Sequence, residues 1–117
     1  MISLPTNLRI FVARDPADMR KGFNGLQGLV TTELNEDPLS GHLFLFLNRR
    51  GDRVKVFYWD GDGLAIWYKR LEQGRFQLPE FAADQTKANI ASDELAMLLG
   101  GIDLRNLKRS KRYSLQS

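Results

Sequence analysis

The sequence predicts an α+β domain: a four- or five-stranded antiparallel β-meander with one amphipathic helix packed on one face, and a short C-terminal helix plus basic tail. Apolar residues recur in steps of three and four over residues 16–35, the period of a helix. Runs rich in β-branched and aromatic residues alternate with turn residues over 42–78, as in a meander of strands. The length of 117 residues suits one domain, which we expect to cover 1–104, with the tail at 105–117.

The first strand and the first helix meet at an aspartate–proline pair. Residues 8–14, LRIFVAR, read as a strand. Asp15 is then expected to cap a helix whose first residue is Pro16. The apolar stripe of this helix comprises Met19, Phe23, Leu26, Val30 and Leu34.

Three glycines interrupt this helix at three-residue spacing: Gly22, Gly25 and Gly28. Each weakens a helix by up to about 1 kcal/mol relative to alanine. Their spacing therefore indicates a close approach to another backbone. It is not the spacing of a phosphate-binding loop, so nucleotide binding has little support.

The meander predicts a register between neighbouring strands. If Gly61-Asp62 is a two-residue turn, Trp59 lies opposite Leu64, and two further pairs follow. These are Phe57 with Ile66 and Lys55 with Tyr68, while the preceding turn places Phe46 beside Lys55. A last strand, RFQL, is expected after Glu72-Gln73-Gly74.

This register divides the strands into two faces. The aliphatic face is expected to seat the helix of 16–35; it holds Leu43, Leu45, Leu47, Val54, Val56, Tyr58, Ala65 and Trp67. The aromatic face mixes rings with basic groups; it holds His42, Phe44, Phe46, Asn48, Arg53, Lys55, Phe57, Trp59, Leu64, Ile66, Tyr68 and Arg70. Such a face can stack bases while holding phosphates, but the favoured interpretation is that the second helix covers it. A second copy or another protein is a third alternative.

The C-terminal part reads as a connector, a short strand and a helix. Residues 79–91 form the connector, with a strand at 87–90. Ser92 is expected to cap the helix, the acidic groups of Asp93 and Glu94 suit the positive end of its dipole, and Gly100-Gly101 ends it.

Positive charge is concentrated in the tail. The last thirteen residues hold five of the seventeen basic residues and no acidic one. These are Arg105, Lys108, Arg109, Lys111 and Arg112. The tail is thus either an electrostatic arm for nucleic acid or an acidic partner, or a solvated terminus.

The side chains give little support for catalysis. The chain has no cysteine and one histidine, His42, with no serine in a nucleophile motif. Asp60-Gly61-Asp62-Gly63 reads as a hairpin turn rather than a calcium loop. We therefore expect a non-enzymatic protein without cofactor or bound metal. It has neither an apolar run of about 20 residues nor a signal sequence, so a cytoplasmic location without membrane contact is expected.

Two stretches resemble the TnpB-like accessory protein of the insertion sequence 66 family of bacterial transposons. They are DMRKGFNGL at 18–26 and DPLSGHLFLFLNRRGDRVKVFYWDGDGLAIWYKRLEQGRFQLP at 37–79. The resemblance implies a small non-catalytic partner of a separate, larger transposase that is needed for efficient transposition. It carries over no residue roles.

Together these observations predict an accessory protein for transposition that binds DNA. The expected phosphate contacts are Arg49, Arg50, Arg53, Lys55, Arg105, Lys108, Arg109, Lys111 and Arg112. The expected partner or base-stacking surface is Phe44, Phe46, Phe57, Trp59 and Tyr68. The alternative is an adaptor that docks onto the transposase, or onto other accessory proteins of the same element, without direct DNA binding.

Overall fold

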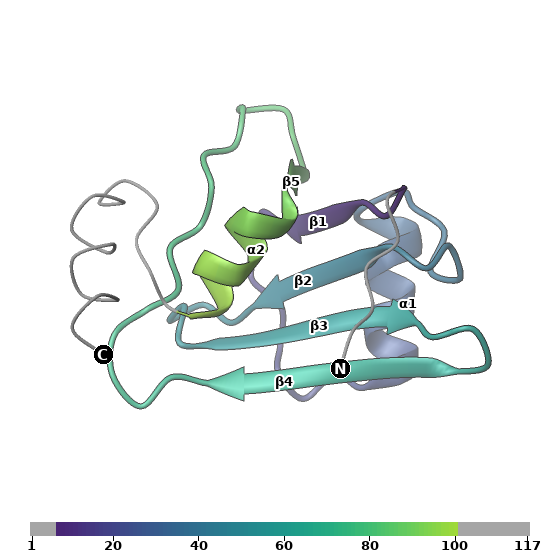
Figure 1. Ribbon diagram of the computed structural model, residues 1–117, viewed down its shortest axis with the longest axis horizontal. Coiled ribbons are helices and arrows are strands. Elements are labelled where there is room, and N and C mark those ends of the chain that lie inside the picture. Colours follow the sequence, from purple (N-terminus) through teal and green to yellow (C-terminus); the bar gives the residue numbers. More distant parts are fainter. Residues whose placement is uncertain (1–6, 101–117) are drawn as a thin grey trace.

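Five strands form one mixed sheet with the order β4-β3-β2-β1-β5, and a helix lies on each face (Figure 1). The computed structural model describes residues 7–100. The strands are β1 (Ile10–Ala13), β2 (Leu43–Leu47), β3 (Arg53–Trp59), β4 (Leu64–Arg70) and β5 (Lys87–Ile90), and the helices are α1 (Phe23–Thr32) and α2 (Ser92–Leu99). The α+β prediction is confirmed. The predicted tail lies outside the described residues.

The meander of β2, β3 and β4 has the predicted register. Trp59 pairs with Leu64, Phe57 with Ile66, and Lys55 with Tyr68. On the other side of β3, Phe46 pairs with Lys55. The Asp60 amide donates to the Gly63 carbonyl at 2.8 Å and closes the hairpin. The short strand at 87–90 is confirmed as β5, which pairs antiparallel with β1.

The prediction of an all-antiparallel sheet is wrong at β1. This strand pairs parallel with β2, with Ile10 opposite Leu43. Two parallel neighbours need a long crossover, which here contains α1. The predicted strand RFQL is also wrong: Phe76 is buried, and its amide donates to the Gly51 carbonyl at 2.8 Å, outside the sheet.

The two helices lie on the opposite faces to those predicted. Helix α1 buries Leu26 and Val30 on the aromatic face, against Phe44, Phe46 and Phe57, and Leu34, just after the helix, joins the same cluster. Helix α2 buries Leu95 and Leu98 on the aliphatic face, with Phe76 beside them. In Figure 1, α2 lies in front of the sheet and α1 behind it. The sheet is therefore covered on both faces, as in a two-sided core.

Helix α1 begins at Phe23 rather than at Pro16. The preceding residues form an irregular segment attached to the sheet, since the Ala17 amide donates to the Leu47 carbonyl at 2.8 Å. Gly22 occupies the N-cap without a side-chain hydrogen bond. As a result Phe23 lies outside the core, with half of its surface exposed.

The glycines of α1 do not serve a close approach within residues 7–100. A Cβ at Gly22 or Gly28 would have no atom within 4 Å, whereas one at Gly25 would lie 2.9 Å from Lys21 Cβ. The interpretation of Gly22 and Gly28 as sites of close approach within this part of the chain is therefore wrong. Both lie at the surface.

Helix α2 is shifted by one residue at its start and ends as predicted. Ala91, rather than Ser92, is the N-cap, and its amide donates to Glu94 Oε1 at 2.9 Å. Gly100 is the C-cap. Within residues 7–100, neither helix is long and apolar enough to span a membrane.

Candidate nucleic-acid interface

The predicted basic residues of the folded part separate into two environments. Arg49 and Arg50 are exposed in the turn between β2 and β3, and Arg53 is partly buried at the start of β3. Lys55 is buried, with 9% of its surface exposed. The tail residues Arg105, Lys108, Arg109, Lys111 and Arg112 lie outside the described part of the chain.

Asn48 shapes the turn that carries Arg49 and Arg50. Its Oδ1 accepts from the amides of Asp52 and Arg53, both at 3.0 Å, and its Nδ2 donates to Asp52 Oδ1 at 2.7 Å. Gly51 has a φ of +77°, a conformation that side chains with a Cβ disfavour. The turn is therefore held from within, and its two arginines project from a fixed backbone.

A second turn, between β4 and Phe76, packs against the first. The Leu71 amide donates to the Asp52 carbonyl and the Phe76 amide to the Gly51 carbonyl, both at 2.8 Å. Gly74, with a φ of +81°, reverses the chain and brings Arg75 next to Gly51. The two turns enclose a polar hollow of about 210 Å³, the arginine hollow, lined by Arg49, Arg50, Asp52, Gly74 and Arg75.

Arg75 was not among the predicted site residues. The predicted meander could have indicated it. In an antiparallel meander the first and third strands run in the same direction, so the turns that follow them lie at the same end of the sheet. The turns at 49–52 and 72–74 are therefore neighbours, as the structure shows.

The arginine hollow is positively charged even though Asp52 lies in it. The hydrogen bond from Asn48 lowers the pKa of Asp52, and the charges of Arg50 and Arg53 lower it further. Asp52 is thus ionised, but three arginines face one carboxylate. Arg53 also pairs across the sheet with Arg70, whose guanidinium is 3.3 Å from Glu72 Oε1.

The described chain ends at the same end of the sheet. Lys69 Nζ donates to the Leu99 carbonyl at 2.8 Å, and Lys69 is next to Arg70 at the end of β4. Figure 1 shows α2 ending over the end of the sheet at which β2 and β4 also end. Gly100, which the predicted tail follows in sequence, therefore lies on the side of the molecule that holds the arginine hollow.

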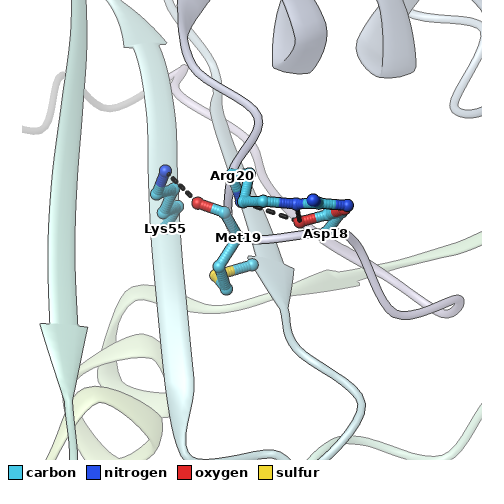
Figure 2. A network of polar contacts seen from close by, with 4 residues as sticks. All are labelled: Asp18, Met19, Arg20 and Lys55. Carbon is cyan, nitrogen blue, oxygen red and sulfur yellow. Dashed lines mark hydrogen bonds and ion pairs between the residues drawn. The ribbon is translucent and has the colours of Figure 1, made fainter.

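The prediction of Lys55 as a phosphate contact is wrong in this structure. Its ammonium nitrogen donates to the Met19 carbonyl at 2.8 Å (Figure 2) and to the Lys21 carbonyl at 2.9 Å. It also lies 4.9 Å from the centre of the Tyr68 ring. Lys55 therefore holds the segment before α1 on the sheet, and its ammonium group is buried against two carbonyls rather than presented at the surface.

Three of the five predicted aromatic surface residues are also excluded from the surface. Phe44, Phe46 and Phe57 are at most 1% exposed because α1 covers them. Trp59 is partly buried, and Tyr68 keeps 47% of its surface exposed. The prediction of a base-stacking platform on the aromatic face is therefore wrong.

His42, the one histidine of the sequence, has a structural partner. His42 Nδ1 accepts from the Arg9 amide at 3.0 Å at the start of β1. Within residues 7–100, no group of three or more histidine, cysteine, aspartate or glutamate residues is placed to hold a metal ion. The arrangement with the clearest chemical use is the arginine hollow, which suits an anion with several oxygens.

Comparison with known proteins bears on the resemblance found in the sequence. A family model described as IS66 Orf2 like protein matches residues 8–109. Two proteins of Sinorhizobium fredii (strain NBRC 101917 / NGR234) are each 38% identical to the chain. Uncharacterized protein y4jC matches over 109 residues, 93% of this chain and 92% of the relative; Uncharacterized protein y4hO matches over 112 residues, 96% of each. No solved structure matches the chain. The chain therefore belongs to the IS66 Orf2-like family, which associates it with an accessory role in transposition.

Proposed function

We propose that this accessory protein acts in the cytoplasm by binding the DNA backbone at the arginine hollow, without catalysing a reaction itself. The observation that carries the proposal is the convergence of Arg49, Arg50 and Arg75 on one hollow. Two turns supply these residues, and hydrogen bonds between the turns hold them in register.

The chemistry of the hollow favours phosphate. A guanidinium group offers paired N–H donors that match two oxygens of a phosphate. Because the turn backbone is already ordered by Asn48, binding orders fewer groups than it would on a loose loop. Because the Asp52 carboxylate repels anions, we expect a phosphate to bind at the rim of the hollow, beside the arginine side chains.

The tail is proposed as the second part of the same interface. It adds Arg105, Lys108, Arg109, Lys111 and Arg112 to a chain that reaches Gly100 at the arginine end. Such a tail would attract DNA without regard to sequence and so raise the rate of encounter. The fixed contacts at the hollow would then set the position of the protein on the DNA.

The test is a fluorescence anisotropy titration of an element-end duplex and a scrambled duplex at several salt concentrations. Arg75→Ala, and separately Arg49→Ala, is expected to reduce the slope of log affinity against log salt by about 0.9 for each phosphate charge that the variant no longer neutralises. In full-length protein with the five basic tail residues changed to glutamine, the slope of log affinity against log salt is expected to become shallower by about 4–5. The matched control is Arg9→Ala, an exposed arginine before β1 at the opposite end of the sheet.

Equal slopes for wild type, Arg75→Ala and the tail variant would overturn the proposal. A preference of the wild type for the element-end duplex would add sequence recognition to backbone binding. Absence of binding at moderate salt would favour the adaptor.

The adaptor is supported by a different surface. Strand β4 lies at the edge of the sheet, and its neighbouring residues Trp67 and Tyr68 are 38% and 47% exposed. The two side chains lie on opposite faces of this edge strand, and exposed Trp and Tyr are both enriched at protein interfaces. Co-purification with the transposase that survives nuclease treatment, and that Trp67→Ala and Tyr68→Ala abolish without unfolding the protein, would support this function over DNA binding.

A further inference from the structure

Arg20 is an exposed arginine whose side chain is nevertheless held in place. Its side chain is 91% exposed, at the surface before α1. Its Nε donates to both carboxylate oxygens of Asp18, at 3.1 and 3.0 Å, and its Nη2 donates to Asp18 Oδ2 at 2.7 Å. Figure 2 shows the guanidinium lying along the Asp18 carboxylate.

The backbone of Arg20 is held as well. Lys55 Nζ binds the carbonyls of the residues on either side, Met19 and Lys21. The Arg20 amide donates to Asp18 Oδ1 at 2.9 Å. Since Lys55 is buried in the middle of the sheet, between Phe46 and Tyr68, the segment is anchored to the core. Arg20 is thus fixed at both its backbone and its side chain.

The ion pair leaves one edge of the guanidinium unoccupied. Asp18 uses Nε–H and one hydrogen of Nη2. Both hydrogens of Nη1 and one of Nη2 remain. One hydrogen from each of these two nitrogens forms a pair of parallel donors along the outer edge, which matches two acceptors set side by side. Two residues along the chain, Gly22 is exposed, and a Cβ there would have no atom within 4 Å.

Stability alone does not account for this arrangement. Exposed ion pairs contribute little to folding, because water screens the charges and the side chains lose freedom. Binding gains more from the same ordering, because a guanidinium that is already oriented loses less freedom when it meets its ligand.

We propose that Arg20 is a recognition residue whose outer edge binds two adjacent hydrogen-bond acceptors of duplex DNA. The acceptors are either O6 and N7 of a guanine in the major groove or two oxygens of one phosphate. The inference rests on the proposed DNA binding and adds to it a position outside the arginine hollow. The negative charge of Asp18 offsets that of Arg20, so the pair suits the neutral edge of a base better than a phosphate.

The test uses the full chain and Arg20→Lys, which keeps the charge but removes the paired donors. Affinity for a guanine-containing element-end duplex is expected to fall about tenfold. Asp18→Asn, which leaves Arg20 without its orienting charge, is expected to weaken binding in the same direction. Arg9→Lys is the control, and thermal unfolding of each variant checks that the fold is retained.

A second duplex distinguishes the two acceptors. If Arg20 binds guanine, wild type and Arg20→Lys bind equally to a duplex in which 7-deazaguanine removes N7. If Arg20 binds a phosphate, the difference between them persists on that duplex. Either result supports the proposal. Equal binding of Arg20→Lys and wild type to all duplexes, while Arg75→Ala still weakens binding, overturns the role of Arg20 and leaves the proposed function intact. Absence of DNA binding by the wild type overturns both.

Discussion

Lys55 donates from its ammonium nitrogen to the main-chain carbonyl of Met19 at 2.8 Å, across 36 residues of sequence. A second bond, to the Lys21 carbonyl at 2.9 Å, makes this one side chain the main polar link between β3 and the segment before α1. The lysine that the charge pattern suggested for DNA is thus part of the interior of the protein.

Replacement of Lys55 by methionine tests this structural role. The substitution keeps a long apolar stem but leaves the carbonyls of Met19 and Lys21 without their donor. We expect the free energy of unfolding to fall by about 2–4 kcal/mol, since each unsatisfied acceptor is costly. Urea denaturation measures this change. Lys69→Met removes a bond to one carbonyl only, that of Leu99, and should cost less. A loss for Lys55→Met no larger than that for Lys69→Met would contradict the role.

The ion pair of Asp18 and Arg20 should make the stability of the folded protein depend on pH. Hydrogen bonds from Arg20 lower the pKa of Asp18 from its ordinary value of 3.8 to about 2. Because the folded pKa is lower than the unfolded one, the pair contributes fully to stability above pH 3.8, and this contribution is lost as the pH falls from 3.8 through 2. We therefore expect Asp18→Asn to be slightly less stable than wild type at neutral pH, and this difference to disappear as the pH falls through 2.

An NMR titration of the Asp18 carboxyl group measures the same property directly. In Arg20→Gln its midpoint should rise towards 3.8, because the cationic donor is gone. An unchanged midpoint in Arg20→Gln would show that Arg20 is not the cause of the low pKa of Asp18.

Substitution by alanine should change the free energy of unfolding differently at two glycines of α1. Gly28 is exposed and a Cβ there would have no atom within 4 Å, so Gly28→Ala should raise the free energy of unfolding by about 0.5–1 kcal/mol. A Cβ at Gly25 would lie 2.9 Å from Lys21 Cβ, so Gly25→Ala should cancel this gain or destabilise the protein. Thermal unfolding of both variants checks the difference. A destabilised Gly28→Ala would point to packing at this surface that the structure does not contain.

Asn48 should influence DNA binding without contacting DNA. Asn48→Ala removes three hydrogen bonds from the turn that carries Arg49 and Arg50. We expect a loss of about 1–3 kcal/mol in stability and weaker binding at unchanged net charge. The pKa of Asp52 should rise, since the Asn48 hydrogen bond is the main cause of its lowering. Asn89→Ala, at an exposed position of β5, is the comparison. Full affinity of Asn48→Ala for DNA would remove the argument that the turn is pre-organised for phosphate.

The register of the meander and the place of α2 in the chain followed from the sequence alone. Both depend on neighbours in the chain: the turn at Gly61-Asp62 pairs Trp59 with Leu64, and the alternation of side chains then assigns every later pair. The acidic first turn of α2 and the glycine that ends it are local signals too. Such features need no knowledge of distant parts of the molecule.

Which helix covers which face was decided only by the tertiary structure. Both faces of the sheet offer enough apolar surface to seat a helix, so hydrophobicity does not distinguish them. The decision comes from β1, which pairs parallel with β2 and therefore makes α1 a crossover connection with a preferred hand. Pairing of strands distant in sequence is not encoded in the local pattern of either strand.

The candidate sites also combine features that the sequence predicts with features that depend on the tertiary structure. That the basic residues lie in turns could be read from the sequence, but the joining of Arg75 to Arg49 and Arg50 depends on two turns that hydrogen-bond to each other. The burial of Lys55 and its hold on the backbone around Arg20 depend on contacts across more than thirty residues, whereas the Arg20 side chain is held by its neighbour Asp18. Local preference determined most elements of this protein. The tertiary structure decided that one buried lysine pairs with the carbonyls of the segment before α1, and that two turns join to form the arginine hollow.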